Sequence, residues 1–190
     1  MNRITAYIRQ SLQDIYPPEE VKALSMLICC DMLGVDALDI YMGKDIILSA
    51  CKQRELENII FRLQKNEPIQ YIRGYAEFCG RNFRVAPGVL IPRPETAELG
   101  DLIVKENPDA RRLLDIGTGS GCIAISLDKK LPDAKVDAWD ISEEALAIAR
   151  KNNEELDAQV TFCRQDVFSA DGIQGASYDI IVSNPPYVTE

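Results

Sequence analysis

The sequence predicts an α/β fold, with a small N-terminal helical bundle followed by a parallel sheet of which about four strands are present. Apolar residues recur at helical spacing up to about residue 73, whereas short apolar runs alternate with helical patterns after residue 92. A glycine-rich turn over residues 117–121 joins the first of these runs to a helix. We therefore expect a helical domain in residues 1–73, a β-hairpin connector in residues 74–91 and a partial α/β domain in residues 92–190.

The helical domain is predicted from three apolar stripes, each wide enough to form one face of a small core. Pro17-Pro18-Glu19-Glu20 separates the first two, because prolines end one helix and acids suit the first turn of the next. The stripes contain Ile4, Tyr7, Ile8, Leu12 and Ile15, then Val21, Leu24, Leu27 and Ile28, and finally Leu56, Ile59, Ile60 and Leu63.

The spacing of the apolar residues changes after residue 73, and this change predicts the connector and the second domain. Two short β-prone runs, residues 75–79 and 82–85, flank Gly80-Arg81 and predict a hairpin. Helices are then expected near residues 95–106, 120–131 and 142–153, and strands near residues 112–116, 135–139, 159–163 and 178–182. A parallel sheet of order 3-2-1-4 would leave the strand at 178–182 as an exposed apolar edge, open to self-association.

The composition excludes several classes of site. The chain has no histidine, so neither a Ser-His-Asp triad nor a His-ligated metal site can be built, and we expect no metal. The six cysteines form no CxxC pair and are expected to be reduced core thiols. A net charge of −9 argues against direct binding of duplex nucleic acid. No stretch approaches the roughly 20 apolar residues of a membrane span, so we expect a cytoplasmic protein with no membrane partner.

The turn after residues 112–116 has the composition of a nucleotide-cofactor loop. Gly117, Gly119 and Gly121 allow a sharp turn and a close approach of the backbone to a ligand. Asp115 lies two residues before the first glycine, and this spacing differs from the GxGxxG of nicotinamide-binding folds. The pattern favours S-adenosylmethionine, with dinucleotide binding by a dehydrogenase as the second interpretation.

Polar residues follow the later strands at the same predicted edge. Asp140 lies at the carboxyl end of the strand at 135–139 and is placed to accept hydrogen bonds from ribose hydroxyls. Asp166 and Val167 follow the next strand, where the carboxylate is placed to accept from an adenine amine. Asn184-Pro185-Pro186-Tyr187 follows the last strand. Its two prolines remove N–H donors, so the Asn184 side chain and the Pro185 carbonyl are expected to point outward as acceptors.

Three segments together resemble the release-factor glutamine methyltransferases (PrmC/HemK family). They are Leu90-Ile91-Pro92-Arg93-Pro94-Glu95-Thr96, then residues 115–121, then residues 184–187. The resemblance covers the whole chain and implies a Rossmann-like class I methyltransferase domain, in a C-terminally truncated form because that fold has more strands than this chain contains. The chain departs from the family pattern at Ala97, where an acid usually follows the threonine.

The resemblance also implies a function and the roles of individual residues. The family methylates the glutamine amide in the Gly-Gly-Gln loop of peptide chain release factors, with S-adenosyl-L-methionine as cofactor and the helical domain helping to hold the release factor. The implied catalytic residues are Asn184, Pro185 and Tyr187. The implied cofactor contacts are Asp115, Gly117, Thr118, Gly119, Gly121, Asp140, Asp166, Val167 and Asn184. The implied substrate contacts are Asn184, Pro185, Pro186, Tyr187 and Arg93.

Two other functions stay open on the sequence alone. One is methylation of an adenine amine in nucleic acid, because an Asn-Pro-Pro-Tyr motif also suits that nitrogen, although the acidic charge and the helical domain oppose it. The other is an inactive form that only binds release factors through its helical domain.

Overall fold

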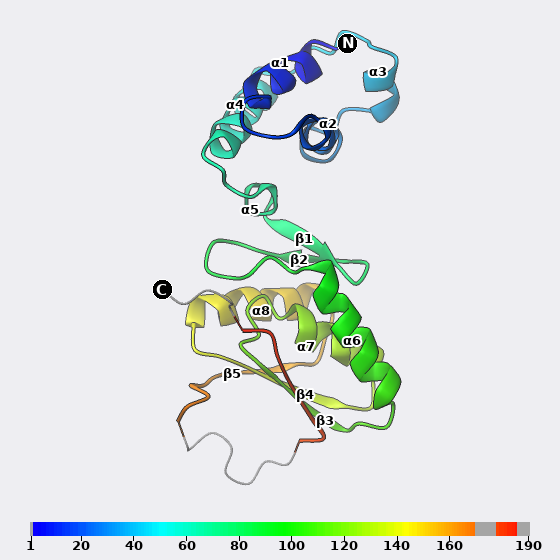
Figure 1. The fold of residues 1–190 in the computed structure, drawn as a ribbon, viewed down its shortest axis with the longest axis vertical. Helices are drawn as coiled ribbons and strands as arrows, with labels where there is room; N and C mark the ends of the chain where they lie inside the picture. Colours follow the sequence, from blue (N-terminus) through cyan, green and yellow to red (C-terminus); the bar gives the residue numbers. More distant parts are fainter. Residues whose placement is uncertain (1, 170–177, 186–190) are drawn as a thin grey trace. The chain divides into compact units, whose positions relative to one another are not determined.

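The computed structural model describes residues 2–169 and 178–185 and divides into two compact units, Met1–Arg73 and Gly74–Glu190. The first unit is helical and the second contains all the described strands, as Figure 1 shows. The α/β fold class predicted from the sequence is therefore confirmed.

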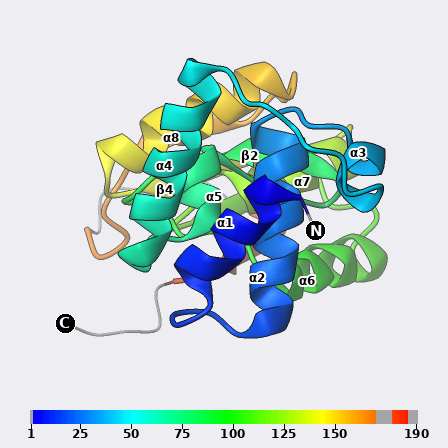
Figure 2. The ribbon, with the colours of Figure 1, turned by 90° about the horizontal axis from the view of Figure 1, so that it is seen from above.

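The first unit is built from five α-helices and one π-helix in its described part. They are α1 (Arg3–Leu12), α2 (Pro18–Met26), η1 (Leu27–Met32), α3 (Ala37–Tyr41), α4 (Ala50–Gln64) and α5 (Ile69–Arg73). Helix α1 packs against both α2 and α4 (Figure 2). Asn2 and Ser49 cap α1 and α4, since their side chains accept the N–H of Ile4 and of Lys52.

The core of this unit follows the predicted stripes with two exceptions. Ile8 and Leu12 of α1 and Leu56 of α4 are almost fully buried. Tyr7 and Ile15 were expected on the same apolar face but are exposed: the buried face of α1 is the narrower stripe at four-residue spacing, and Ile15 lies beyond the end of the helix at Leu12. The short helices α3 and α5 had no counterpart among the predictions, and η1 falls where the stripe of α2 was predicted to continue.

The second unit begins with the predicted hairpin. Strands β1 (Tyr75–Phe78) and β2 (Arg81–Arg84) pair antiparallel, with Tyr75 opposite Arg84. Gly80 and Cys79 both adopt positive φ at the turn, at +70° and +49°. Phe83 of β2 is fully buried and contacts Phe78 edge to face, so the hairpin belongs to the core of this unit.

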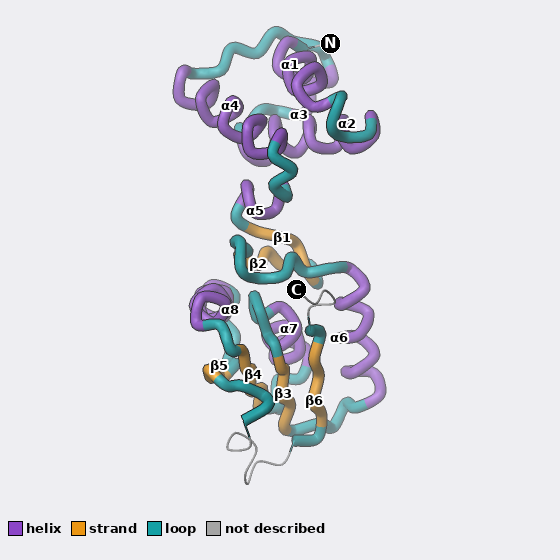
Figure 3. Tube along the Cα trace, turned by 60° about the vertical axis from the view of Figure 1, so that its left-hand side comes forward, coloured by secondary structure: helices purple, strands orange, loops and turns teal. Residues whose placement is uncertain are grey.

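A parallel four-stranded sheet forms the rest of the second unit. Its described strands are β3 (Arg112–Ile116), β4 (Lys135–Asp140), β5 (Thr161–Arg164) and β6 (Ile180–Ser183), and its helices are α6 (Pro94–Glu106), α7 (Cys122–Lys130) and α8 (Glu143–Glu155). The strand order is β5-β4-β3-β6, which is the predicted 3-2-1-4 (Figure 3). Central β3 pairs with both β4 and β6, so the ends of these strands lie side by side.

One face of the sheet, helix α7 and Ile103 of α6 are parts of the main core. Leu113, Val136, Ala138 and Val182 lie on this face and are buried in a cluster with apolar residues of α7. Helices α7 and α8 contact the strands there. Ser142 caps α8 as predicted, its hydroxyl accepting the Ala145 N–H at 3.2 Å.

The cysteines are all free thiols, but two of them are outside the core. Cys29 and Cys122 are buried as expected. The expectation is wrong for Cys51 and Cys163, which are exposed, because Cys51 lies on the outer side of α4 and Cys163 on the edge strand β5. Within residues 2–169 and 178–185, no helix is long and apolar enough to span a membrane, and no group of acidic or sulfur side chains is arranged to hold a metal ion.

Candidate functional site

A cavity of about 470 Å³ lies in the second unit at the carboxyl ends of the strands. It has the size typical of small-molecule sites, roughly 300–1,000 Å³. Many of the residues singled out from the sequence line it: Gly117, Gly119, Asp140, Asp166, Val167 and Asn184. The structure thus brings together residues from the ends of four strands, as expected for a parallel α/β sheet.

The glycine loop borders this cavity with its backbone. Gly117 and Gly119 have φ of +72° and +56°, and a Cβ on either would meet no atom within 4 Å. The space beside these two glycines is therefore open, and their positive φ is the conformation that favours glycine. The loop is held against β4, because the N–H groups of Gly117 and Thr118 both donate to the Trp139 carbonyl, at 2.8 and 3.0 Å.

Gly121 is required for a different reason. Its φ is +80°, and a Cβ there would lie 3.2 Å from the Ala149 side chain and 3.2 Å from that of Ile125. This glycine lets the start of α7 approach α8 rather than a ligand, and it does not line the cavity. Its predicted cofactor contact remains a prediction.

Asp140 is fixed at the cavity wall by two backbone amides. Its Oδ2 accepts the Gly119 N–H and its Oδ1 accepts the Ser142 N–H, each at 2.9 Å. The carboxylate therefore joins the glycine loop to the start of α8. Since each carboxylate oxygen has two lone pairs, Asp140 retains acceptor capacity for ribose hydroxyls on the cavity side.

Asp115 lies behind the loop, where it is only 1% exposed. Its Oδ2 accepts the Thr118 hydroxyl at 2.7 Å, while within the described part of the chain Oδ1 accepts no hydrogen bond of normal geometry. Burial raises the pKa of Asp115 to about 6, against the opposing effects of the Thr118 hydroxyl and the nearby Ala124 N–H. Asp115 does not line the cavity, and in this structure it contacts the loop through the hydrogen bond from Thr118.

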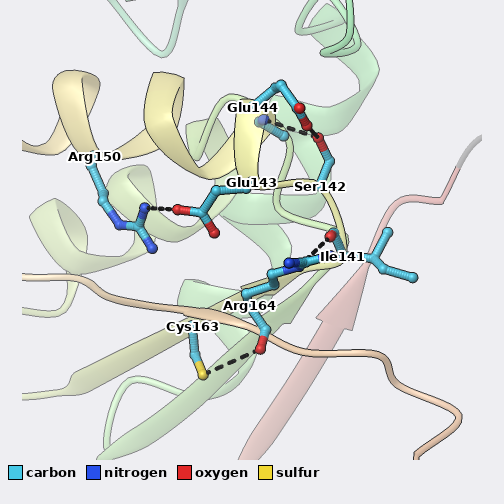
Figure 4. A network of polar contacts seen from close by, with 8 residues as sticks. Ile141, Ser142, Glu143, Glu144, Arg150, Cys163 and Arg164 are labelled. Atoms are coloured by element: carbon cyan, nitrogen blue, oxygen red, sulfur yellow. Dashed lines mark hydrogen bonds and ion pairs between the residues drawn. The ribbon is translucent and has the colours of Figure 1, made fainter.

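The rim beside Asp140 is held by a polar network, drawn in Figure 4. Arg164 of β5 donates from Nε to the Ile141 carbonyl at 3.1 Å, and Ile141 lines the cavity. The Ser142 hydroxyl donates to Glu144 at 2.9 Å, and this bond together with the Glu144 N–H lowers the pKa of that carboxyl. The network fixes the start of α8 against the end of β5.

The residues after β5, the strand next to β4, supply a further part of the wall. Asp166 accepts the Phe168 N–H at 2.9 Å, which forms a tight turn that exposes Val167 and Phe168 at the cavity. Phe168 is 93% exposed and was not predicted, although an aromatic residue directly after Asp166-Val167 was a usable signal. Gly88, Val89, Leu90 and Ala145 also line the cavity without having been predicted.

Asn184 is the one residue of the Asn-Pro-Pro-Tyr motif with described side-chain contacts. Its Nδ2 donates to the Thr96 hydroxyl of α6 at 3.1 Å. The preceding Ser183 hydroxyl donates to the Ile116 carbonyl at 2.8 Å, so the end of β6 is tied to that of β3. Pro185 is exposed, whereas Pro186 and Tyr187 lie outside the described residues.

Arg93 lies apart from the main cavity. It is exposed, occupies the N-cap position of α6, and lines a small side cavity of about 30 Å³ together with Thr96, Thr118 and Asn184. The structure therefore places Arg93 close to the Asn184 end of the site, where its predicted substrate contact is untested.

Comparisons with known proteins agree with the fold and the site. Residues 99–190 match the family model of the methyltransferase small domain, and residues 4–74 match that of the PrmC N-terminal domain. Among solved structures, part of the chain is similar to the T. thermophilus 16S rRNA N2 G1207 methyltransferase in complex with AdoMet and guanosine. The TM-score is 0.51 at 25% identity, covering 60% of this chain and 32% of that one. Fold and site thus define a class I methyltransferase domain.

Curated relatives give the family. The chain is 98% identical to the release factor glutamine methyltransferase of Bacteroides thetaiotaomicron, over its full length and 68% of that protein. It is 40% identical to the protein of the same name from Flavobacterium psychrophilum, covering 94% of this chain and 64% of the relative. The chain belongs to the release factor glutamine methyltransferase family, and it spans about two thirds of the length of these two relatives.

Proposed function

We propose that the chain carries the cofactor site and the amide-binding motif of an enzyme that methylates the glutamine amide in the Gly-Gly-Gln loop of peptide chain release factors. One observation carries the proposal: Asn184 lines the same cavity as Gly117, Gly119 and Asp140. A group held by Asn184 and a cofactor held by the glycine loop would therefore meet in one space.

The cofactor in this proposal is S-adenosyl-L-methionine, which supplies an electrophilic methyl group on a sulfonium. The backbone of Gly117 and Gly119 leaves room for the cofactor, and Asp140 accepts hydrogen bonds from its ribose. Asp166 and the exposed side chains of Val167 and Phe168 form the wall for the adenine. The T. thermophilus enzyme in complex with AdoMet supports this choice of cofactor.

The chemistry assigned to Asn184 and Pro185 is orientation. The lone pair of an amide nitrogen is delocalised, so it is a weak nucleophile unless its N–H groups are held. The Asn184 side-chain oxygen and the Pro185 carbonyl accept those two N–H groups and direct the nitrogen toward the methyl group, while Tyr187 offers a flat stacking surface. Such positioning is worth about 7–11 kcal/mol in favourable cases. The proton leaves after methyl transfer, so the absence of histidine is no obstacle.

The partner in this proposal is a release factor, and the site of action is the cytoplasm, where translation takes place. Similarity to a 16S rRNA methyltransferase keeps nucleic acid as a competing substrate class. The match to the PrmC N-terminal domain and the net charge of −9 both favour the protein substrate over a direct duplex contact.

The test compares this chain with the complete Bacteroides relative. Each is incubated with purified release factor, DNA and isotopically labelled S-adenosylmethionine, and mass spectrometry locates the label. Label on the glutamine of the Gly-Gly-Gln loop is the expected result. Methylated DNA with unmodified release factor would overturn the proposal. If the relative alone is active while this chain binds release factor, the chain is a binding module.

A further inference from the structure

We propose that Thr96 is a positioning residue that holds the Asn184 side-chain amide in place, an inference that rests on the proposed methylation of an amide. Thr96 lies in the first turn of α6, and its hydroxyl accepts the Asn184 Nδ2 hydrogen bond at 3.1 Å. The two residues are 88 positions apart in the sequence, and both line the small side cavity beside the glycine loop.

Both partners of this hydrogen bond are held by their own secondary structure. The Thr96 N–H donates to the Arg93 carbonyl at 3.0 Å, which fixes the first turn of α6. Asn184 directly follows β6, where Val182 pairs with Asp115 of β3 and the Ser183 hydroxyl donates to the Ile116 carbonyl. The hydrogen bond therefore joins two supported backbones and favours the Asn184 side-chain position that keeps this contact.

The orientation matters because the two ends of an asparagine amide have opposite hydrogen-bonding character. One end is an NH₂ donor and the other is a carbonyl acceptor, and a half-turn about the terminal bond exchanges them. A threonine hydroxyl can donate as well as accept, so the hydrogen bond to Thr96 holds the side chain in place; with Nδ2 toward Thr96, as in the structure, Oδ1 points to the other side. A substrate amide N–H requires an acceptor, so the reversed orientation would oppose one donor to another.

The matched variants are Thr96→Val, which keeps the shape and removes the hydroxyl, and Thr96→Ser, which keeps the hydroxyl. Glu98→Gln, an exposed change on the same helix, is the control. We expect Thr96→Val to lower kcat about 10-fold, the value of one ordinary hydrogen bond, with little change in KM for S-adenosylmethionine. Thr96→Ser and Glu98→Gln should stay within about 2-fold of the parent. The assay uses whichever form, this chain or the complete relative, methylates release factor.

A double-mutant cycle separates action through Asn184 from a separate effect on folding. Asn184→Ala should lower kcat by about 100-fold or more. If Thr96 acts through Asn184, then Thr96→Val adds nothing in the Asn184→Ala background. If the effects of the two substitutions on kcat multiply instead, the inference is overturned.

A second measurement needs no substrate. In ¹⁵N-labelled protein, the Asn184 side-chain NH₂ signals should shift and exchange faster with solvent in Thr96→Val, but remain unchanged in Thr96→Ser. Unchanged signals in Thr96→Val would refute the positioning role whatever the substrate is. Shifted signals, with release factor left unmethylated by both this chain and the complete relative, would refute the proposed function and retain the link between Thr96 and Asn184. Thermal unfolding of each variant shows that the comparison is made on folded protein.

Discussion

Asp140 is the residue at which the cofactor site can be tested most directly. Both of its carboxylate oxygens accept backbone N–H groups, from Gly119 and from Ser142, so it shapes the loop as well as facing the cavity. We expect Asp140→Ala to weaken S-adenosylmethionine binding about 10- to 100-fold in calorimetry, as for the loss of hydrogen bonds to a charged group. Asp101→Ala removes an exposed carboxylate from α6 and should leave the affinity unchanged. Equal affinities for both variants would exclude the assigned role of Asp140.

Asp115 gives a prediction about stability and pH. Its pKa is raised from the ordinary 3.8 to about 6, chiefly by burial, so the folded protein binds this proton more tightly than the unfolded chain. The stabilisation that comes from this tighter proton binding is fully present below the pKa of the unfolded chain and is lost as pH rises through about 6. Asp115→Asn should therefore increase the free energy of unfolding at neutral pH, by up to about 3 kcal/mol. Urea unfolding between pH 4 and 8, with exposed Asp133→Asn as control, measures it. A lower stability of Asp115→Asn at neutral pH would contradict the prediction.

The sequence predicted these residues because each directly follows a strand. Asp140, Asp166 and Asn184 meet at one edge for that reason, whereas Asp115 and Gly121 lie in the same motif but face the protein interior. Thr96 had no such signal as a contact of Asn184. Its contact joins residues 88 positions apart and depends on where α6 begins relative to β6, which no local pattern specifies.

At the scale of elements, segments with their own apolar pattern were predictable and segments without one were not. The strands of the sheet and their order were predicted, because apolar runs between helices leave few arrangements of a parallel sheet. The six-residue π-helix, Leu27–Met32, continues the apolar pattern of α2 and was read as one helix. Helix α3 has no buried residue, so it carries no stripe that sequence analysis could detect.

Strand β6 is the element most exposed to unwanted pairing. In the described part of the sheet it pairs with β3 alone, and Ile181 on it is 56% exposed. We expect concentration-dependent self-association of this chain in sedimentation velocity, because an apolar edge strand offers unpaired backbone groups to another copy. Ile181→Lys should increase the monomer fraction, whereas Thr161→Lys on the opposite edge strand β5 should have little effect. A parent chain that stays monomeric at high concentration would contradict this expectation.

At the scale of the molecule, the chain consists of two units with separate cores. The first unit buries its own apolar cluster, including Ile8, Leu12, Ile28, Leu56 and Leu63. We expect a fragment of residues 1–73 to fold alone, with helical circular dichroism and dispersed amide signals, because its buried side chains contact one another. Ile8→Asp is the matched control and should abolish both signals. An unfolded fragment would show that this core depends on the rest of the chain.

The same fragment separates recognition from catalysis. If the helical unit holds the release factor, the fragment should bind it in a pull-down with purified components and leave it unmethylated. Binding confined to residues 74–190 would instead place recognition on the methyltransferase unit.

The sheet order also has a consequence for how the two sides of the cavity form. The bond from Gly119 to Asp140 closes a loop of 21 residues, whereas Ser183 to Ile116 and Asn184 to Thr96 span 67 and 88 residues. Contacts between distant residues cost more chain entropy and slow folding. We therefore expect the Gly119–Asp140 side of the cavity to form before the side that contains Asn184, which native-state hydrogen exchange of the two sides would test. Partial unfolding would then open the cavity in the reverse order and remove the Asn184 side first.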